Sequence, residues 1–358
     1  MVKITFNNKQ AAFYTTLKQQ IDEYFREHRI KKTGNWKLYL KTGILLPLAL
    51  LLYIILLLNI VPAFVSLILC FLLGFTFACI GFNVMHDACH GSYSENKSVN
   101  EVLSLTMNAL GSNAFIWKIK HNIIHHTYTN VDGVDDDIAK SPVLRLCNTQ
   151  KWMPMHRIQH LYLPFVYALS SLLWVLILDF IKYFNKKIVI TPITTMKTKD
   201  HIVFWLSKIL YVVFYVVIPV ICVGWLPWLV GFLTMHVALG FVLALVFQLA
   251  HVVEDTSFEE LKNDSKQIES EWAIYQVRTT ANFAMKNKTI SWLVGGLNYQ
   301  IEHHLFPRIS HVHYPALSKI VQQTCLRFDI PYNHFPTMSA AVVSHFKMMK
   351  EFGRRPIN

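Results

Sequence analysis

The stretch TGILLPLALLLYIILLLNIVPAFVSLILCFLLGFTFACIGFNVMH, residues 42–86, contains no Asp, Glu, Lys or Arg over 45 residues. A second stretch of the same length, residues 209–253, is equally free of charge. One membrane-spanning helix needs about 20 apolar residues, so each stretch has room for two spans joined by a turn. We therefore expect two helical hairpins, with membrane-spanning helices at about residues 43–61, 63–83, 205–223 and 227–250.

The composition and the turn residues agree with an all-α integral membrane protein. Hydrophobic residues make up 53% of the 358-residue chain, and the mean hydropathy is +0.33. Pro62 marks the turn of the first hairpin, and Trp225, Pro227 and Trp228 mark that of the second. Tryptophan is enriched at membrane–water interfaces, so the second turn is expected at the membrane surface.

The basic residues are placed as an orientation signal. Of the 34 Lys and Arg residues, nine lie in residues 1–42, 12 in 84–200 and 12 in 252–358; the remaining one is Lys208, and both hairpin turns carry none. The positive-inside rule therefore places both termini and the central segment in the cytoplasm. We interpret the net charge of +12 as this orientation signal, with the basic cytoplasmic face toward anionic lipid. The charge therefore does not indicate a nucleic-acid partner.

Two further apolar segments are expected to lie along the membrane surface. Residues 160–184 are long and apolar enough to span, but a single additional crossing would put the histidine motifs described below on opposite faces of the membrane. We therefore predict an interfacial or re-entrant helix there. If residues 102–119 also crossed the membrane, as a sixth span, all three motifs would return to one face. These residues carry lysine at one end and asparagine within, however, which favours an interfacial position.

Three histidine motifs are the main chemical signal. The chain reads HDACH from His86 to His90, HNIIHH from His121 to His126, and QIEHH from Gln300 to His304. Residues spaced i,i+4 project from one face of a helix, and neutral imidazole is the commonest protein ligand for redox-active metals. The predicted topology brings all three motifs to the cytoplasmic face. The sequence therefore predicts a metal site there, with His86, His90, His121, His125, His126, His303 and His304 as ligands.

His251 is an eighth candidate ligand. It ends the fourth predicted span at the cytoplasmic interface, in FQLAH, and a site for two irons with mostly nitrogen ligands needs about eight donors. His236 lies in the middle of a span, where we expect a hydrogen-bonded histidine or a tunnel-lining one rather than a ligand. His160, His311 and His313 are interpreted mainly as structural groups or as hydrogen-bond partners of ligands.

Metal-bound histidine usually donates its other N–H to a carboxylate or another acceptor. Asp87, Glu302 and Asn298 stand next to the motifs and are the predicted partners of this kind. The acidic run Asp132, Asp135, Asp136 and Asp137 leaves three alternatives open: support for the ligands, docking of a basic electron donor, or a solvated loop. No HExxH, GxGxxG or Walker A motif is present, which disfavours a zincin protease and a nucleotide site.

With these motifs and the flanks HHTYTNVDGVDDDI and GGLNYQIEHHLFP, residues from about 40 to 320 resemble the membrane fatty acid desaturases. Gln300 stands where many desaturases have histidine, which is similar to the front-end subgroup. That subgroup inserts a double bond between an existing one and the carboxyl end. Its members often carry a fused cytochrome b5, but this chain has no HPGG haem-binding motif. The resemblance therefore implies a separate electron donor, such as ferredoxin or cytochrome b5.

The resemblance also implies a site, a substrate and a domain plan. It implies two iron ions held by the eight histidines, with Gln300 in a ligand position, either binding weakly or through water. It implies a tunnel for an acyl chain, and Trp117, Tyr299 and His236 are the predicted wall residues. Residues 1–42 are the expected cytoplasmic N-terminal segment, 43–320 the desaturase domain with a helical cap that carries the di-iron site, and 321–358 the cytoplasmic C-terminal segment.

The expected reaction takes an acyl chain linked to a lipid or to CoA, dioxygen and two electrons, and yields a cis-unsaturated chain. Two alternatives remain. A fatty acyl or lipid hydroxylase would use the same di-iron scaffold and differ only after the first hydrogen abstraction. A metal transporter or a non-redox metal protein should place ionisable residues along a path across the membrane, yet both 45-residue stretches lack Asp, Glu, Lys and Arg.

Overall fold

The computed structural model describes residues 4–8, 11–139, 142–193, 195–260 and 267–355. In this part of the chain the structure is almost wholly helical, and the strands are two-residue segments that pair two by two. The parallel pairs are β1 (Thr5–Phe6) with β6 (Gln267–Ile268), β2 (Val131–Asp132) with β5 (Glu259–Glu260), and β7 (Asn282–Phe283) with β8 (His334–Phe335). The antiparallel pair is β3 (Lys187–Ile188) with β4 (Thr191–Pro192).

Five continuous helices among the described residues are long and apolar enough to cross a membrane, which makes this a membrane protein. They cover Trp36–Leu58, Ala63–His90, Pro154–Asn185, Thr198–Val223 and Trp225–His251. Their parts are α2 (Trp36–Leu58); α3 (Ala63–Ile80), η1 (Gly81–Met85) and α4 (His86–His90); η3 (Pro154–Ile158), α9 (Gln159–Leu173), η4 (Trp174–Leu178) and α10 (Asp179–Asn185); α11 (Thr198–Val212), η5 (Val213–Val217) and α12 (Ile218–Val223); and α13 (Trp225–His251).

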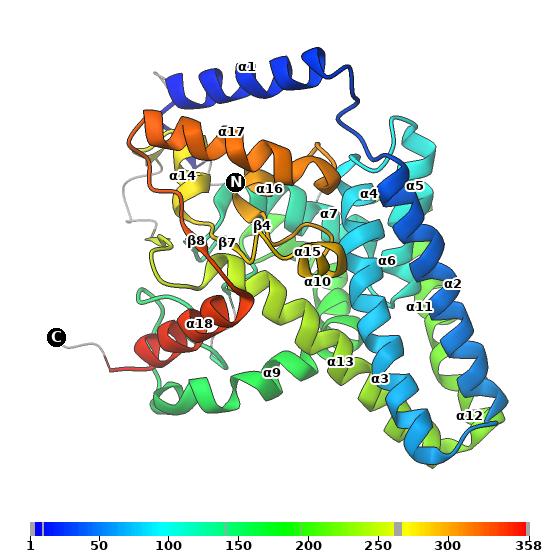
Figure 1. Ribbon diagram of the computed structural model, residues 1–358. Coiled ribbons are helices and arrows are strands. Elements are labelled where there is room, and N and C mark those ends of the chain that lie inside the picture. The colour runs from blue at the N-terminus through cyan, green and yellow to red at the C-terminus, as the bar shows by residue number, and fades with distance from the viewer. Residues whose placement is uncertain (1–3, 9–10, 140–141, 194, 261–266, 356–358) are drawn as a thin grey trace.

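Four of these helices coincide with the predicted spans and form two hairpins. In Figure 1, α2, α3, α12 and α13 run side by side toward the lower right, and the contacts between them agree with this view. The first turn contains Asn59 in a left-handed conformation, and the second is at Gly224, whose φ of 86° suits glycine. The helices extend past the predicted ends, because α2 already begins at Trp36 and the second helix continues to His90.

The fifth long helix covers the segment predicted to lie along the surface. It packs through α9 against α13, and in Figure 1 α9 crosses the direction of α13 instead of continuing the hairpins. The other segment predicted at the surface, residues 102–119, consists of short helices, none of which is long enough to span. They are α5 (Lys97–Ser104), α6 (Thr106–Ala109) and α7 (Ala114–Lys118).

The remaining helices gather at the end of the hairpins that carries the histidine motifs (Figure 1). They are α1 (Ala12–Glu27), η2 (Ile119–His125), α8 (His126–Tyr128), α14 (Trp272–Arg278), α15 (Lys288–Leu293), α16 (Gln300–Leu305), η6 (His311–His313), α17 (Tyr314–Arg327) and α18 (Met338–Phe352). Helix α1 buries Phe13, Leu17, Ile21 and Phe25, which are spaced by four, against the cluster that contains α17 residues.

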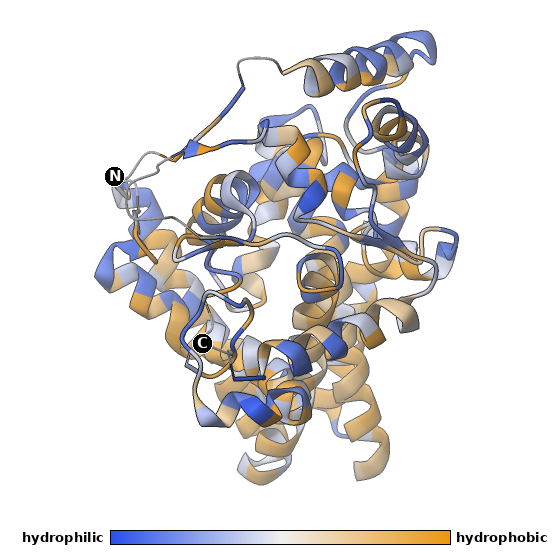
Figure 2. Ribbon diagram, turned by 90° about the vertical axis from the view of Figure 1, so that its left-hand side faces the viewer, coloured by the Kyte–Doolittle hydropathy of each residue, from blue (hydrophilic) through white to orange (hydrophobic). Residues whose placement is uncertain are grey.

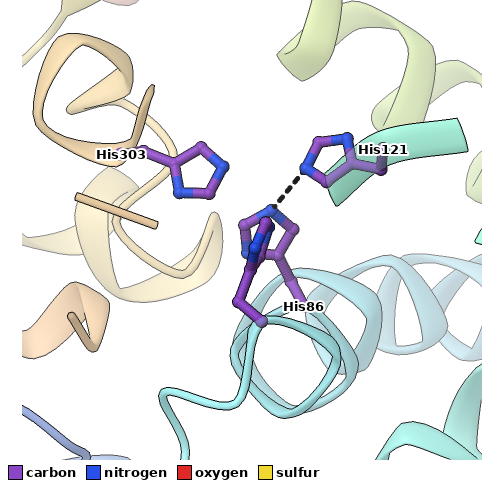
Figure 3. A group of neighbouring side chains, drawn as sticks. His86, His121 and His303 are labelled. Atoms are coloured by element: carbon purple, nitrogen blue, oxygen red, sulfur yellow. Dashed lines mark hydrogen bonds between the residues drawn. The ribbon is translucent and has the colours of Figure 1, made fainter. Parts of the chain in front are cut away.

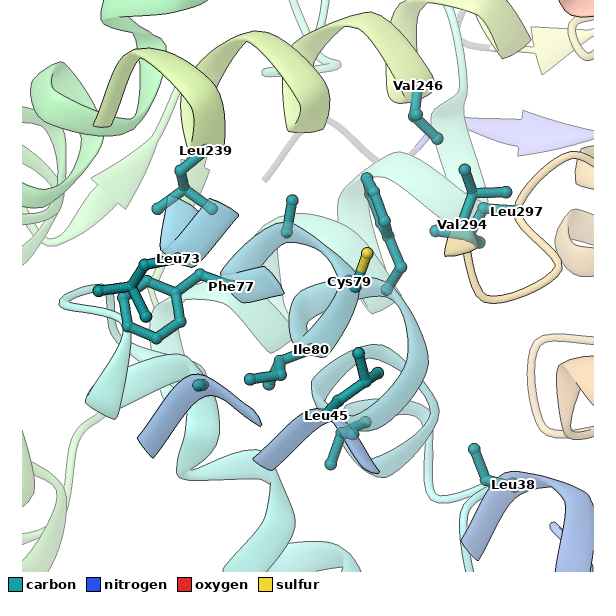
Figure 4. Close-up of a cluster of buried hydrophobic side chains, with 14 of the residues drawn as sticks. Leu38, Leu45, Leu73, Phe77, Cys79, Ile80, Leu239, Val246, Val294 and Leu297 are labelled. Atoms are coloured by element: carbon teal, nitrogen blue, oxygen red, sulfur yellow. The ribbon is translucent and has the colours of Figure 1, made fainter. Parts of the chain in front are cut away.

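The largest hydrophobic cluster joins the hairpins to the segment that precedes α16. Leu45 of α2, Phe77 of α3 and Leu239 of α13 belong to it, together with Val294 and Leu297 (Figure 4). Gly74 permits the close crossing of α3 and α13, because a Cβ at this position would lie 2.1 Å from the Met235 carbonyl oxygen. Figure 2 shows hydrophobic residues dominating the hairpins and hydrophilic residues more frequent at the opposite end.

Candidate metal centre

Residues from all three histidine motifs meet in a four-histidine group made of His86, His90, His121 and His303. One ring nitrogen from each lies within 4.8 Å of the others, and all four side chains are buried. The Nε2 atoms of His86 and His121 are 3.2 Å apart, and Figure 3 shows the rings of His86, His121 and His303 pointing toward one another. Such a convergence of buried imidazoles is the expected donor set for a transition metal.

A three-histidine group lies beside the first and consists of His125, His251 and His304. Their ring nitrogens also lie within 4.8 Å of one another, and His251 enters from the last residue of α13. His126 stands between the two groups, with its ring centroid 4.5 Å from that of His303 and 4.4 Å from that of His304. All eight predicted histidine ligands are therefore in one buried constellation.

Local backbone features place the motifs. HDACH forms the predicted helical turn, but HNIIHH is wound as a π-helix, η2, and another π-helical turn, η1, directly precedes HDACH. The second motif is thus helical, as its i,i+4 spacing suggests, although its turns are π-helical as far as His125 and His126 begins α8. The rings of His121 and His125 stack with their centroids 5.2 Å apart and form a further group with Asp137, while each also belongs to a different one of the two histidine groups. Single π-helical turns within helices frequently mark functional sites.

Five of the eight rings fit a metal centre because their inner nitrogen has no partner among the described residues. Nε2 of His90, His125, His251, His303 and His304 is buried without a hydrogen-bond partner. The opposite nitrogen, Nδ1, is held in four of these rings: by Asp135 in His125, Tyr314 in His303, Gln276 in His304 and the Thr279 carbonyl in His251. An outer hydrogen bond fixes the tautomer and leaves the Nε2 lone pair free for a metal.

The electrostatic environment keeps most of these rings neutral. Burial and the neighbouring histidines lower the pKa of His121, His126, His303 and His304 well below the ordinary value. Burial also lowers the pKa of His125, but the carboxylates of Asp135 and Asp137 outweigh this effect and raise its pKa overall. Neutral imidazole is the form that binds a metal, so the rings with a lowered pKa are already in the protonation state that metal binding requires.

The predicted polar partners lie near the motifs but contact other groups. The Asp87 carboxylate is 3.0 Å from His311 Nδ1 and accepts a hydrogen bond from Ser310. Glu302 accepts hydrogen bonds from Asn282 and Tyr332, and burial raises its pKa to about 7. Asn298 donates to Ser291. These contacts hold the segments of the first and third motifs, and within the described part of the chain Asp87, Glu302 and Asn298 make no hydrogen bond to a predicted ligand ring.

The predicted tunnel residues occupy three different places. Trp117 stacks on His121, with ring centroids 4.3 Å apart, and lies next to the four-histidine group. Tyr299 donates to the Met285 carbonyl and packs in the cluster under α1. His236 is held within the hairpin region by Ser171 and Tyr211. Gln300 is buried at the start of α16, and its Nε2 has no partner among the described residues.

The acidic run after the second motif is turned inward. Asp135 is completely buried against His125, and Asp137 pairs with Lys120 at 2.5 Å. Asp136 pairs with Lys182, and Asp132 accepts from Thr149 and Gln150. Of the three alternatives, ligand support describes Asp135, and the internal pairing of the others disfavours a free acidic docking loop.

Sequence reasoning missed four groups that hold the ligand rings: Gln276, Tyr314, the Thr279 carbonyl and Thr129, whose hydroxyl is 3.2 Å from His304 Nδ1. Thr129 carries the one local signal, since it follows His125 by four residues and donates to its carbonyl. The others come from α14 and α17, which reach the rings only through the tertiary structure.

Known proteins with similar sequences carry desaturase names. The sn-1 linoleoyl-lipid 6-desaturase of Synechocystis sp. is 35% identical over 98% of this chain and 98% of its own length. The acyl-lipid (8-3)-desaturase of Physcomitrium patens is 34% identical over 95% of this chain and 72% of its own length. The acyl-lipid (8-3)-desaturase of Mortierella alpina is 30% identical over 96% of this chain and 78% of its own length. The family model "Fatty acid desaturase" matches residues 61–336, and the chain belongs to this family of oxidoreductases.

Proposed function

We propose that this enzyme inserts a cis double bond into an acyl chain carried by a membrane lipid, between an existing double bond and the carboxyl end. The observation that carries the proposal is the buried constellation of eight histidines in a chain that matches a linoleoyl-lipid 6-desaturase almost end to end. In a linoleoyl chain, position 6 lies on the carboxyl side of the existing double bonds. The glutamine that opens the third motif agrees with this regiochemistry.

Two iron ions are the proposed cofactor. His86, His90, His121 and His303 would hold one iron, and His125, His251 and His304 the other, with His126 between them. Gln300, at the start of α16, is proposed to act at the centre directly or through water. When bound, iron supplies with dioxygen the oxidant that an unactivated methylene requires. Two electrons from a separate ferredoxin or cytochrome b5, with two protons, complete the reduction of dioxygen to water.

The protein's own residues orient the donors and keep water away. The outer hydrogen bonds that the Nδ1 atoms make to Asp135, Tyr314 and Gln276 fix the rings, so that little reorganisation is needed when a metal binds. Trp117, stacked on His121, and the apolar residues around it exclude water from the side of the four-histidine group. Exclusion of water protects a strongly oxidising site from side reactions.

Asp135→Asn tests the proposed role of the carboxylate behind His125. Asparagine is nearly the same size but removes the negative charge, so the His125 ring loses basicity and orientation. We expect iron affinity to fall by about 10- to 100-fold, the usual effect of removing such a partner. Iron per protein is measured by mass spectrometry during titration with Fe(II). The matched control is Asp132→Asn, whose carboxylate contacts Thr149 and Gln150. Equal iron affinity in the two variants would contradict the role.

We further propose a four-span topology with the metal centre and both termini on the cytoplasmic face, and with the helix Pro154–Asn185 at the interface. The oblique course of α9 and the location of all basic clusters away from the hairpin turns support this arrangement. In a background without native cysteines, Ile60→Cys in the first turn should react with an impermeant thiol reagent in intact cells. Asn148→Cys, also exposed in the structure, should react only after lysis. Reaction of both in intact cells would rule out this topology.

The product identifies the reaction. The chain is expressed with a ferredoxin or cytochrome b5 donor in cells fed linoleate, and the fatty acids are analysed by mass spectrometry. We expect a new double bond on the carboxyl side of the existing ones. An added oxygen atom would instead identify a hydroxylase on the same scaffold. Zinc in place of iron after purification, with no oxidised product, would favour a non-redox metal protein.

A further inference from the structure

Trp272, the first residue of α14, joins the surface of the molecule to a predicted ligand of the metal centre. Its side chain is half-buried, and its indole N–H donates to the His126 carbonyl at 3.3 Å. The ring centroid of His126 is 4.5 Å from that of His303 and 4.4 Å from that of His304, so His126 stands between the two histidine groups. One hydrogen bond and one residue therefore separate the Trp272 indole from both groups.

A second aromatic side chain lies beside Trp272 at the surface. The Tyr14 ring of α1 meets the Trp272 ring edge-on, with centroids 5.6 Å apart, and it stacks at 6.2 Å on Phe306. Tyr14 is also half-buried, and its backbone N–H donates to Glu271, the residue before Trp272. Tyr14 and Trp272 thus form an aromatic patch between α1 and α14. Tyrosine and tryptophan are enriched among the residues that carry most of the energy of protein interfaces.

The exposed face of α1 next to the aromatic patch carries basic residues. Lys18 and Arg26 follow the patch along this face, and their side chains are 56% and 76% exposed. They pair with Asp22 and Glu23 at the surface, where such pairs contribute little, so an incoming carboxylate can compete for both cations. Residues 1–42 together carry nine Lys and Arg against three Asp and Glu. A protein with an acidic surface therefore suits this face.

The aromatic patch is on the side of the molecule that a water-soluble protein can reach. In Figure 1, α1 lies at the end opposite the hairpin turn beside α12. The histidine motifs gather at the same end as α1, so the distance from this surface to the metal centre is short (Figure 1). Electron transfer through protein falls steeply with distance and is favoured by bonded paths such as the one from Trp272 to His126.

Another aromatic contact with the metal centre is directed toward lipid. Trp117 stacks on a predicted ligand ring, and the half-buried Trp174 packs in the same cluster as Trp117. Trp174 belongs to the long apolar helix Pro154–Asn185, where Leu176 is 52% exposed. Exposed apolar side chains on a helix of this kind face the membrane. A water-soluble protein therefore approaches the metal centre at Trp272 and not at Trp174.

We propose that a water-soluble [2Fe–2S] ferredoxin docks on the aromatic patch and the basic face of α1, and that its electrons enter through Trp272. This docking surface rests on the proposed desaturase function and belongs to the electron donor of that reaction. Plant-type ferredoxins are strongly acidic, which complements Lys18 and Arg26. Electron-transfer complexes are transient and bury little surface, so a patch of this size is sufficient.

The electrons balance as follows from the proposed reaction. Two reduced ferredoxins each lose one electron and leave in the oxidised form. These two electrons, two protons and the two hydrogen atoms removed from the acyl chain reduce dioxygen to two molecules of water. The Trp272 indole is a bridge for each electron and is itself neither oxidised nor reduced.

The first test measures docking without turnover. The enzyme in lipid discs is immobilised, and binding of oxidised plant-type ferredoxin is followed by surface plasmon resonance. We expect association with Lys18→Glu/Arg26→Glu to be slower by about tenfold, because steering by charge changes association rates by about 10- to 1,000-fold. The matched control, Lys151→Glu/Lys350→Glu, reverses two exposed cations outside α1. Equal association rates in the two double variants overturn the proposal, as does binding of cytochrome b5 without binding of ferredoxin.

The second test removes the proposed entry residue. In Trp272→Leu, we expect the iron-loaded enzyme to oxidise reduced ferredoxin at least about tenfold more slowly, the usual scale for loss of a central interface tryptophan. The rate is measured by stopped flow without oxygen. Reduction of the same variant by dithionite, which needs no docking, should be unchanged. The control is Trp152→Leu, which removes another half-buried indole that donates to a backbone carbonyl, that of Gly353.

The outcomes separate this proposal from the proposed function. An unchanged ferredoxin rate in a folded Trp272→Leu enzyme, or an equal loss of rate with dithionite, overturns the entry through Trp272. Ferredoxin binding that depends on Lys18 and Arg26 supports the docking surface even in an enzyme that forms no double bond. That absence of product would count against the proposed function alone, because binding is measured without catalysis.

Discussion

His251→Ala is expected to lower the iron content by about half and to abolish turnover, because the three-histidine group would keep only two protein nitrogens. The ring centroid of His251 is 4.7 Å from that of His125 and 4.9 Å from that of His304. Its Nδ1 is held by the Thr279 carbonyl and its buried Nε2 has no other partner, which is the geometry of a ligand. Iron per protein and product formation are measured on the purified variant.

The control for this prediction is His334→Ala, which removes an exposed histidine outside the constellation. Membrane insertion should be normal in both variants, because each changes one side chain at the end of an element. Full iron occupancy with normal turnover in His251→Ala would remove His251 from the ligand set. Loss of iron with full turnover would show that the second iron is dispensable.

Lys208→Met is expected to lower the free energy of unfolding by about 3–5 kcal/mol, the cost of leaving a buried charge without its partner. Lys208 is the sole charged residue from 201 to 253, and its ammonium contacts the Asp179 carboxylate at 2.9 Å. It also donates to the carbonyls of Gly111 and Val175. Asp179 in turn accepts from Ser112 and Trp174, so one ion pair joins α11, α10 and the loop before α7.

A double variant separates this charge effect from loss of packing. In Lys208→Met/Asp179→Leu both charges are replaced by apolar groups, and most of the stability should return, since such replacements of buried pairs are often neutral or stabilising. Lys199→Met, on the exposed face of the same helix, should change stability little. Unfolding is followed by denaturant titration in mixed micelles. A single variant as stable as the wild type would show that Asp179 carries no charge in the fold.

The ion pair also bears on the metal centre. Trp174 contacts the apolar cluster of Met85, Met107 and Trp117, and the Lys120 ammonium lies 4.8 Å from its ring centroid. Displacement of the loop before α7 would therefore move the second histidine motif. The ion pair therefore links α11 and α10 to the segment that carries the second histidine motif.

The long helices could be predicted from the sequence because the bilayer leaves few alternatives. An apolar stretch such as residues 42–86 must satisfy its backbone hydrogen bonds internally, so it forms helices, and its length sets their number. The first and last residues of these helices were predicted less accurately. Helix α2 begins before the expected residue, since Lys41 is buried and donates to Asn83 instead of ending the helix at the membrane surface.

The histidines of the candidate metal centre could also be predicted from the sequence, because each motif is local and chemically unusual. The sequence by itself therefore determined the apolar helices, the kind of donor and the family. Only the tertiary structure decided how the histidines divide into two groups and which residues hold their Nδ1 atoms. The physical reason is that these features depend on contacts such as His303 with His86 or Gln276 with His304, between segments whose separation in the chain carries no periodic signal.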